Sequence, residues 1–238
     1  GTFRKNDTVW EEGQIIRTLH LLIRYPHLDF IDIGANIGAY TMYVAALGRF
    51  VLAVDCFAPN TDRIHQSIQI NNIANRIVLV QNALFSRSGE FLHLSANKTN
   101  IGGQAIQVSN NETILTHSIN NSFTNNPYIV KTITFDELLP IFIQRGIRGA
   151  LMKIDIEGSE SFVVESGGRM FDTLELPFVQ MEWFIVRQYA DRAKVILDFF
   201  FKRNYNPTTC NCIVLNSTQY ASWPSDVCWI KKNYTDFC

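Results

Sequence analysis

Residues 29–40, Asp-Phe-Ile-Asp-Ile-Gly-Ala-Asn-Ile-Gly-Ala-Tyr, constrain the fold more than any other part of the chain. A short apolar run ends in a turn of small residues, and a helical pattern begins directly after it. In α/β proteins, such a turn places a nucleotide-like ligand between the carboxyl end of a strand and the free N–H groups of a helix. The segment therefore predicts a cofactor-binding α/β domain.

Strands and helices alternate along most of the chain. Apolar strands are predicted at residues 30–33, 50–54, 77–81, 150–156 and 177–183. Helical patterns separate most of these strands, and this alternation implies parallel pairing with right-handed crossovers. We therefore expect an α/β fold with a Rossmann-like, mostly parallel sheet.

The predicted organisation is an N-terminal helical segment followed by one main domain, and the main domain contains an insertion and a C-terminal hairpin. Residues 1–28 form an N-terminal helical segment, and residues 29–238 form the main domain. After the third strand, the stretch at about residues 85–128 is rich in Asn, Ser and Thr, and predicts an insertion of short strands and long loops. Residues from about 207 to 238 are expected to form a cysteine-bearing hairpin.

Composition excludes several classes of protein. The chain has 238 residues, 47% of them apolar, which suffices for a full hydrophobic core. A formal net charge of -1 gives no overall positive field, so nucleic acid is not an expected partner. The apolar runs at 19–23 and 196–201 are too short to span a membrane. No signal peptide is seen, and we expect a trimmed or luminal portion of a longer protein.

The turn that contains Gly34, Ala35, Asn36 and Gly38 is a candidate cofactor loop. Its pattern is Gly-x-Asn-x-Gly, whereas pyrophosphate loops generally use Gly-x-Gly-x-x-Gly. Asp32, just before the turn, would repel a pyrophosphate but suits an ammonium group. These features favour S-adenosylmethionine, which carries an ammonium and a cationic sulfur, over NAD. The alternative is an ordinary turn between a strand and a helix.

Further cofactor-binding residues are predicted after the second and third strands. Asp55 ends the second strand, where a carboxylate can accept hydrogen bonds from both ribose hydroxyls; the alternative is a helix-capping acid. Asn82 and Ala83 follow the third strand, where a short polar side chain can bind the adenine amine and a small neighbour leaves room for the ring. A turn asparagine is the alternative there.

The run at 153–160, Lys-Ile-Asp-Ile-Glu-Gly-Ser-Glu, is the candidate catalytic segment. Lys153 and Asp155 share one face of a buried strand, where charges are costly unless they are paired or used. Asp155, Glu157 and Glu160 are expected to meet at the edge where α/β sheets place ligands. We predict that Asp155 acts as a base or metal ligand, that Glu157 assists it, and that Lys153 tunes their charge. The alternative is a structural ion pair with carboxylates that favour a helix start.

The next strand ends with Glu182 and Trp183, which are candidates for binding the substrate at the same edge. A structural role is the alternative for both. The five histidines show no metal-ligand spacing, so the identity of any metal ligands stays open.

These motifs resemble the FkbM-type S-adenosylmethionine-dependent methyltransferases from about Asp29 to Trp183. Phe-Ile-Asp-Ile-Gly-Ala-Asn-Ile-Gly resembles the cofactor loop of that family, and Lys-Ile-Asp-Ile-Glu-Gly-Ser-Glu resembles its most specific signature. The resemblance implies the seven-stranded class I methyltransferase sheet and O-methylation of a hydroxyl, commonly on sugars or polyketide-like products. Asp55 is followed by Cys56 and Phe57, whereas the family often has Glu followed by Pro; the carboxylate is retained.

We therefore expect an O-methyltransferase that uses S-adenosylmethionine and acts on a hydroxyl of a sugar or glycan. A sugar hydroxyl is a poor nucleophile, so a base or a divalent metal should assist the reaction. The alternative is an inactive module of the same fold that binds glycan or protein. A nicotinamide oxidoreductase is disfavoured by Asp32 and by the position of Asn36.

Sequons and cysteines favour the secretory pathway, either the ER/Golgi lumen or secretion, over the alternative of a cytoplasmic protein. Glycosylation sequons start at Asn6, Asn97, Asn111, Asn120, Asn216 and Asn233. The C-terminal region carries Cys210, Cys212, Cys228 and Cys238. Disulfides, reduced thiols and, less favourably, a zinc site are all compatible with this spacing.

Overall fold

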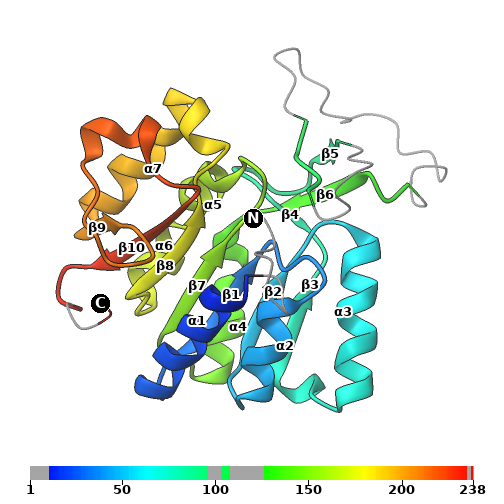
Figure 1. Cartoon of the computed structure of the whole chain (residues 1–238). Coiled ribbons are helices and arrows are strands. Elements are labelled where there is room, and N and C mark those ends of the chain that lie inside the picture. Colours follow the sequence, from blue (N-terminus) through cyan, green and yellow to red (C-terminus); the bar gives the residue numbers. More distant parts are fainter. Residues whose placement is uncertain (1–10, 96–102, 108–125, 235–236, 238) are drawn as a thin grey trace.

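A seven-stranded sheet forms the centre of the computed structural model, which describes residues 11–95, 103–107, 126–234 and 237 (Figure 1). The strand order is β3-β2-β1-β7-β8-β10-β9. The strands are β1 (Asp29–Ile33), β2 (Val51–Val54), β3 (Ile77–Val80), β7 (Ala150–Ile154), β8 (Phe178–Glu182), β9 (Tyr205–Thr208) and β10 (Asp226–Lys231). The strands from β3 to β8 in this order pair in parallel, and β10 is antiparallel to both of its neighbours. The predicted α/β fold with a mostly parallel seven-stranded sheet is confirmed.

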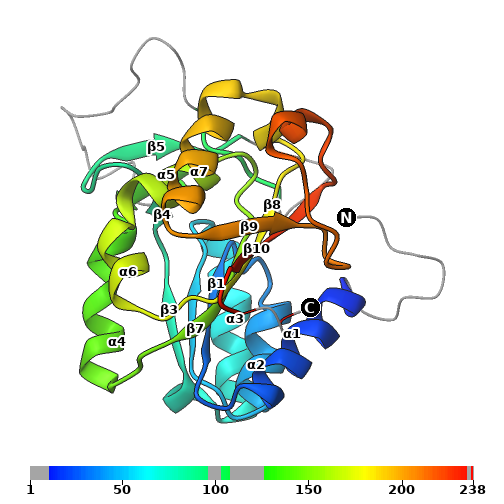
Figure 2. The same ribbon diagram turned by 90° about the vertical axis from the view of Figure 1, so that its left-hand side faces the viewer.

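Helices cover both faces of this sheet, as the perpendicular view in Figure 2 shows. One layer consists of α1 (Glu12–Arg24), α2 (Ala39–Ala46) and α3 (Ala58–Asn71). The other consists of α4 (Leu139–Arg145), α5 (Glu160–Ser166), α6 (Gly168–Thr173) and α7 (Ala190–Lys202). Phe30 of β1 belongs to the apolar core under the first layer, and Ile31 and Ile33 belong to the core under the second. Successive side chains of a strand point to opposite faces, so the apolar run of β1 serves both cores.

The N-terminal helix packs against the sheet. Ile15 and Leu22 of α1 are buried in the core that α2 and α3 also cover. They lie seven positions apart, about two helical turns, so both lie on the same face of the helix. The helix ends at Arg24, shortly before Pro26, which cannot continue a helix.

A small second sheet follows β3. Its order is β4 (Ala83–Leu84), β6 (Ile129–Ile133) and β5 (Phe91–His93). Of the predicted insertion at about residues 85–128, the structure describes 85–95, which include β5, as well as 103–107 and 126–128. Residues 96–102 and 108–125 lie outside the described ones, as do the sequons at Asn6, Asn97, Asn111 and Asn120. Short 3-10 helices are η1 (Ala74–Arg76), η3 (Phe135–Leu138), η4 (Val186–Gln188) and η5 (Ser217–Ser222).

Cys210 follows β9, and Cys228 lies in β10, which pairs antiparallel with β9. The thiols of Cys210 and Cys228 are free, and their Sγ atoms are 3.1 Å apart. Cys212 is disulfide-bonded, whereas a disulfide that includes Cys210 or Cys228 stays a prediction. No helix in the described part of the chain combines the length and apolar character that a membrane span requires.

Candidate active site

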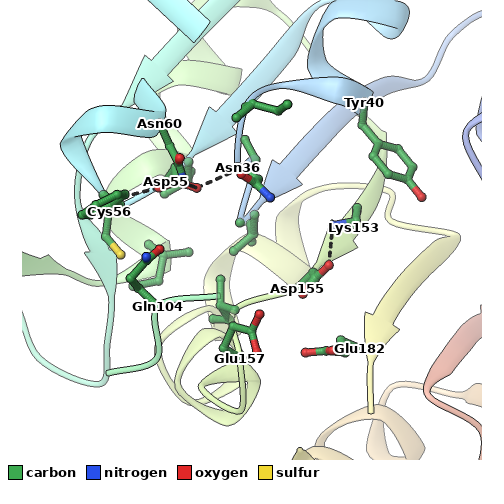
Figure 3. A pocket seen from close by; sticks show the side chains of 18 of the residues that line it. Asn36, Tyr40, Asp55, Cys56, Asn60, Gln104, Lys153, Asp155, Glu157 and Glu182 are labelled. Atoms are coloured by element: carbon green, nitrogen blue, oxygen red, sulfur yellow. Dashed lines mark hydrogen bonds and ion pairs between the residues drawn. The ribbon is translucent and has the colours of Figure 1, made fainter. Parts of the chain in front are cut away.

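The carboxyl ends of the parallel strands border a cavity of about 560 Å³ (Figure 3). Residues that follow β1, β2, β3 and β7 form most of its wall, and the last residue of β8 closes one side. Ten of the predicted site residues line it: Gly34, Ala35, Asn36, Asp55, Asn82, Ala83, Lys153, Asp155, Glu157 and Glu182. The sheet therefore gathers at one edge the residues that the sequence placed at successive strand ends.

The turn after β1 fits closely against the loop after β7. Gly34 and Asn36 both have left-handed backbone conformations, with φ values of 77° and 53°. A Cβ atom on Gly34 would lie 1.7 Å from the carbonyl oxygen of Asp155, so a side chain cannot be accommodated there. The N–H of Asp155 also donates a hydrogen bond of 3.0 Å to the carbonyl of Ile33. The candidate cofactor turn and the candidate catalytic segment are thus in direct contact.

Asp55 connects the turn after β1 to the start of α3 by hydrogen bonds. Its Oδ2 accepts a hydrogen bond of 2.8 Å from the N–H of Asn36, and its Oδ1 accepts one of 2.8 Å from the N–H of Phe57. Burial raises the pKa of Asp55 to about 6, although these hydrogen bonds oppose the shift. Because a carboxylate oxygen has more than one lone pair, both oxygens keep acceptor capacity toward a ligand.

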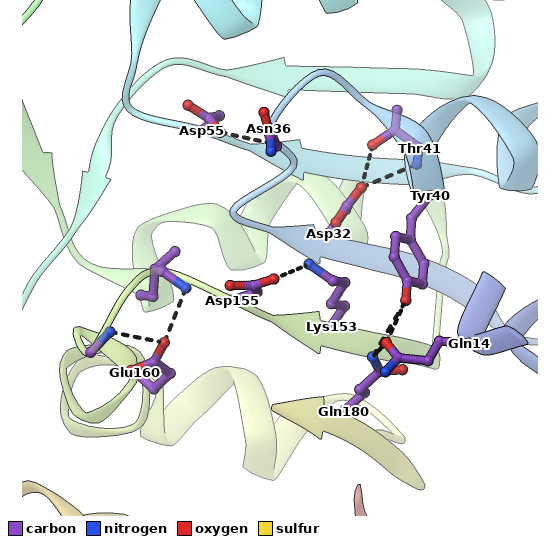
Figure 4. Close-up of polar contacts among 12 residues, drawn as sticks. Gln14, Asp32, Asn36, Tyr40, Thr41, Asp55, Lys153, Asp155, Glu160 and Gln180 are labelled. Carbon is purple, nitrogen blue, oxygen red and sulfur yellow. Dashed lines mark hydrogen bonds and ion pairs between the residues drawn. The ribbon is translucent and has the colours of Figure 1, made fainter. Parts of the chain in front are cut away.

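Asp32 lies beneath the turn and does not line the cavity (Figure 4). It is 1% exposed, and its Oδ2 accepts hydrogen bonds from the N–H (3.1 Å) and the hydroxyl (2.6 Å) of Thr41. These bonds join the end of β1 to the first turn of α2. Asp32 therefore supports the turn from beneath, and its contact with a ligand ammonium stays a prediction.

Gly38 also lies outside the cavity wall, at the start of α2. Its φ of 88° is left-handed, and a Cβ there would lie 3.0 Å from Cγ1 of Ile64 in α3. The small residue thus permits the turn and the close approach of two helices.

Asn82 and Ala83 line the part of the cavity that lies after β3. The Nδ2 of Asn82 donates a hydrogen bond of 3.1 Å to the carbonyl of Lys131 in β6, which fixes the orientation of this amide. Ala83 is buried in an apolar cluster with Phe57. Ala83 and Phe57 both line the cavity, so a small and an aromatic side chain border this part of it.

Lys153 and Asp155 form an ion pair in the cavity wall, with 2.9 Å between Nζ and Oδ2 (Figure 3). Lys153 is 6% exposed, and its Nζ also lies 5.1 Å from the centre of the Tyr40 ring. Burial by itself would lower the pKa of Lys153, but the carboxylates around it, Asp155 first, raise this pKa above its ordinary value. The lysine is therefore a permanent positive charge beside Asp155.

Carboxylates dominate the side of the cavity around this ion pair. Glu157 has a left-handed φ of 55°, and burial followed by the charge of Asp155 raises its pKa. Glu182 lies directly opposite Asp226 in the pairing of β8 with β10. Burial, and then repulsion from neighbouring carboxylates, raise the pKa of Glu182 to about 9. At neutral pH this group therefore carries a proton and can donate a hydrogen bond.

Two residues near the site have structural roles. Trp183 is fully buried, its ring lies 5.2 Å from that of Trp223, and it does not line the cavity. Glu160 is also fully buried, and its Oε1 accepts hydrogen bonds from the N–H groups of Ile156 (3.0 Å) and Gly158 (3.3 Å). Glu160 therefore shapes the loop after β7 (Figure 4).

Several residues of the cavity wall were not predicted. Glu11, Gln104 and Asp226 line the cavity although none of them belongs to a sequence motif at a parallel strand end, and Tyr40, the last residue of the 29–40 segment, lines it as well. Asp226 begins an antiparallel strand, and Gln104 lies in the insertion, so only tertiary structure brings them here. Among the described residues, no group of three or more His, Cys, Asp or Glu side chains is arranged to hold a metal ion.

Comparison with known families identifies the class of this protein. Residues 32–207 match the model of the methyltransferase FkbM domain. Because this match covers more than half of the chain, the protein belongs to the FkbM methyltransferase family. A search of curated proteins gave no match.

Solved structures with a similar fold include several methyltransferases. A Staphylococcus aureus protein assigned as a caffeoyl-CoA O-methyltransferase is 9% identical, with a TM-score of 0.50 and coverage of 94% of this chain and 85% of the other. An O-methyltransferase from Bacillus cereus in complex with SAH is 12% identical, with a TM-score of 0.44 and coverages of 96% and 84%. An rRNA methylase from Streptococcus thermophilus is 12% identical, with a TM-score of 0.43 and coverages of 92% and 94%. At these identities the likeness concerns the fold alone.

Proposed function

We propose that the protein is an S-adenosylmethionine-dependent O-methyltransferase whose acceptor is a hydroxyl group of a sugar or glycan. The observation that carries the proposal is the Lys153–Asp155 ion pair, which lies in the wall of the same cavity as Asp55. One cavity thus combines residues suited to a nucleoside cofactor with a carboxylate suited to accepting a proton. Membership of the FkbM family supports methyl transfer as the reaction.

The residues of the cavity fit this cofactor. Asp55 presents both carboxylate oxygens where ribose hydroxyls can donate to them, and Phe57 and Ala83 border an apolar space suited to a purine. The turn at 34–36 borders the space between this end and Asp155. When bound there, S-adenosylmethionine would supply the methyl group from a sulfonium sulfur.

Asp155 is the proposed general base. Its Oδ2 is bonded to Lys153, which leaves Oδ1 to accept the proton of the acceptor hydroxyl. The ion pair with Lys153 fixes the orientation of this carboxylate in the cavity wall. Holding the hydroxyl beside a fixed base in a closed space also removes much of the entropic cost of bringing reactants together.

The surrounding carboxylates support a neutral, hydroxyl-rich acceptor. Glu11, Glu157 and Asp226 line the cavity with Asp155, and carboxylates accept hydrogen bonds from several hydroxyl groups at once. Glu182, protonated at neutral pH, can donate a hydrogen bond to an acceptor oxygen. An anionic acceptor would be repelled by this set of charges.

A transfer assay tests the proposal. The protein is incubated with labelled S-adenosylmethionine and a panel of monosaccharides and glycans, with and without EDTA. We expect label on a sugar hydroxyl, and loss of transfer in EDTA would show that a divalent metal assists. If S-adenosylmethionine fails to bind at millimolar concentration in calorimetry, the protein is instead an inactive module that binds glycan or protein.

We also propose that this protein resides in the lumen of the secretory pathway or is secreted. The thiols of Cys210 and Cys228 are close enough to be joined by a small side-chain movement, with their two protons and two electrons passing to a disulfide oxidant. Asn216 and Asn233, at the start of two sequons, are exposed. Both features suit an oxidising compartment in which glycans are attached.

A further inference from the structure

Gln104 has an unpaired atom that the proposed function leaves unused. Its side chain is 9% exposed and lines the cavity (Figure 3). Its Oε1 is buried and has no hydrogen-bond partner. A buried amide oxygen without a partner loses its hydration without compensation, so such an atom in a cavity wall indicates a ligand that donates a hydrogen bond to it.

The backbone around Gln104 is held in place by β5. Residues 103–107, called the strap here, run antiparallel to the chain at Leu94. The N–H of Ser95 donates to the carbonyl of Ala105 (2.8 Å), and the N–H of Ala105 donates to Oγ of Ser95 (3.0 Å). The Gln104 side chain is therefore positioned by a hydrogen-bonded segment.

The strap also packs against the cavity wall. Ile106, two residues after Gln104, contacts the apolar cluster that contains Phe57 and Ala83, and Cys56 packs on the same cluster. Cys56 and Phe57 follow β2, Ala83 follows β3, and all three border the end of the cavity assigned above to a purine. In Figure 3, Gln104 lies on the same side of the cavity as Cys56 and Asp55, and away from Lys153.

We propose that Oε1 of Gln104 accepts a hydrogen bond from the 6-amino group of the cofactor's adenine. A residue of the insertion would thus recognise the base. The inference rests on the proposed S-adenosylmethionine site. Asp55 can accept hydrogen bonds from the ribose hydroxyls. The donor that remains for Gln104 is the amino group on the edge of the base. An amino group has two hydrogens, so this assignment leaves one for Asn82, which the sequence predicted to bind the same group and which also lines the cavity. A slot that offers an amide oxygen selects an amino-purine over a purine without that group.

Calorimetry with two ligands tests this assignment. The ligands are S-adenosylhomocysteine and its analogue in which hydrogen replaces the 6-amino group. We expect Gln104→Met to weaken binding of S-adenosylhomocysteine about fivefold, the effect of losing one neutral hydrogen bond, and to leave binding of the analogue within about twofold. Measuring both ligands with the unmodified protein and with Gln104→Met isolates the contact between Gln104 and the 6-amino group.

Gln107→Met is the matched control, because Gln107 is an exposed glutamine of the same strap. It should bind both ligands as the unmodified protein does. If Gln104→Met melts below the working temperature, Gln104→Ala removes the same oxygen and replaces it in the test.

Two results would overturn the inference. In one, the Gln104 variant keeps the full preference of the unmodified protein for S-adenosylhomocysteine over the analogue. In the other, Gln107→Met shifts this preference as much as the Gln104 variant does. If the unmodified protein binds neither ligand, the proposed cofactor site itself is wrong and this inference falls with it, a result distinct from an unchanged preference.

Discussion

At the scale of single residues, surroundings decide what each carboxylate of the cavity can do. Asp155 lies 2.9 Å from a buried lysine, whereas Glu182 faces another carboxylate, Asp226, across two strands. Neighbouring anions favour the protonated form of an acid, as for Glu182, whereas the ion pair orients Asp155. These surroundings suit the two residues to opposite proposed roles, Asp155 as proton acceptor and Glu182 as proton donor.

Substitution of Asp155 tests the first of these roles. Asp155→Asn should lower turnover at least about a hundredfold, because an amide cannot accept the hydroxyl proton, while affinity for S-adenosylhomocysteine is largely kept. Single-turnover kinetics and calorimetry measure the two quantities separately. Asp62→Asn, at an exposed position of α3, is the matched control. Turnover close to that of the unmodified protein would remove Asp155 from the mechanism.

The shifted pKa of Glu182 predicts a pH dependence of stability. Burial raises this pKa to about 9, whereas a glutamate in an unfolded chain titrates near about 4.3. Between these pH values the folded protein binds more protons than the unfolded chain, so its stability falls as pH rises through this window. Glu182→Gln, which cannot ionise, should therefore melt at least about 2 °C higher at pH 8.5. The difference in melting temperature between the variant and the unmodified protein should shrink toward pH 5. An equal difference at pH 8.5 and pH 5 would contradict the raised pKa of Glu182.

At the scale of elements, the loops after β1 and β7 form one unit. The sequence predicted both loops and their common edge, because apolar strands followed by turn residues reveal strand ends locally. It could not show that Gly34 touches the Asp155 carbonyl, since that contact depends on the parallel pairing of β1 with β7. For the same reason the sequence could not show the burial of Trp183, because the tryptophans that pack against it come from distant segments.

Gly34→Ala tests the contact between these loops. A left-handed residue other than glycine costs about 1–2 kcal/mol by itself. The added Cβ, 1.7 Å from a backbone oxygen, should make the loss of unfolding free energy at least about 2 kcal/mol larger than that. Gly146→Ala is the control, because Gly146 has a similar φ of 67° and nothing within 4 Å of the new atom. Equal urea midpoints for the two variants would contradict the predicted clash.

At the scale of the whole molecule, the C-terminal residues meet the N-terminal helix. Arg17 of α1 donates hydrogen bonds to the carbonyl of Cys210 and, over 3.5 Å, to Sγ of Cys228. The hairpin of β9 and β10 and the first helix are thus joined beside the free thiol pair. A covalent bond between Cys210 and Cys228 would fix the place where α1 meets the hairpin of β9 and β10.

Oxidation is expected to join these two thiols. After exposure to a disulfide oxidant, peptide mass spectrometry should find Cys210 linked to Cys228, with Cys56 still free. The closed loop should add about 2–3 kcal/mol of stability, measured as the difference that reductant makes to the unmodified protein but not to Cys228→Ser. Finding both thiols still free after oxidation would refute the pairing and weaken the proposed luminal location.

The sequence by itself determined the alternation of strands and helices, the cofactor turn, and the position of Asp55, Lys153 and Asp155 at strand ends. These features follow from local periodicity and turn chemistry, which a single segment contains. Tertiary structure alone decided that Asp32 supports the turn from beneath, that Asp226 faces Glu182, and that Gln104 reaches the cavity from the insertion. Those contacts join residues far apart in the chain, and they exist only once the sheet order and the packing of the insertion are fixed.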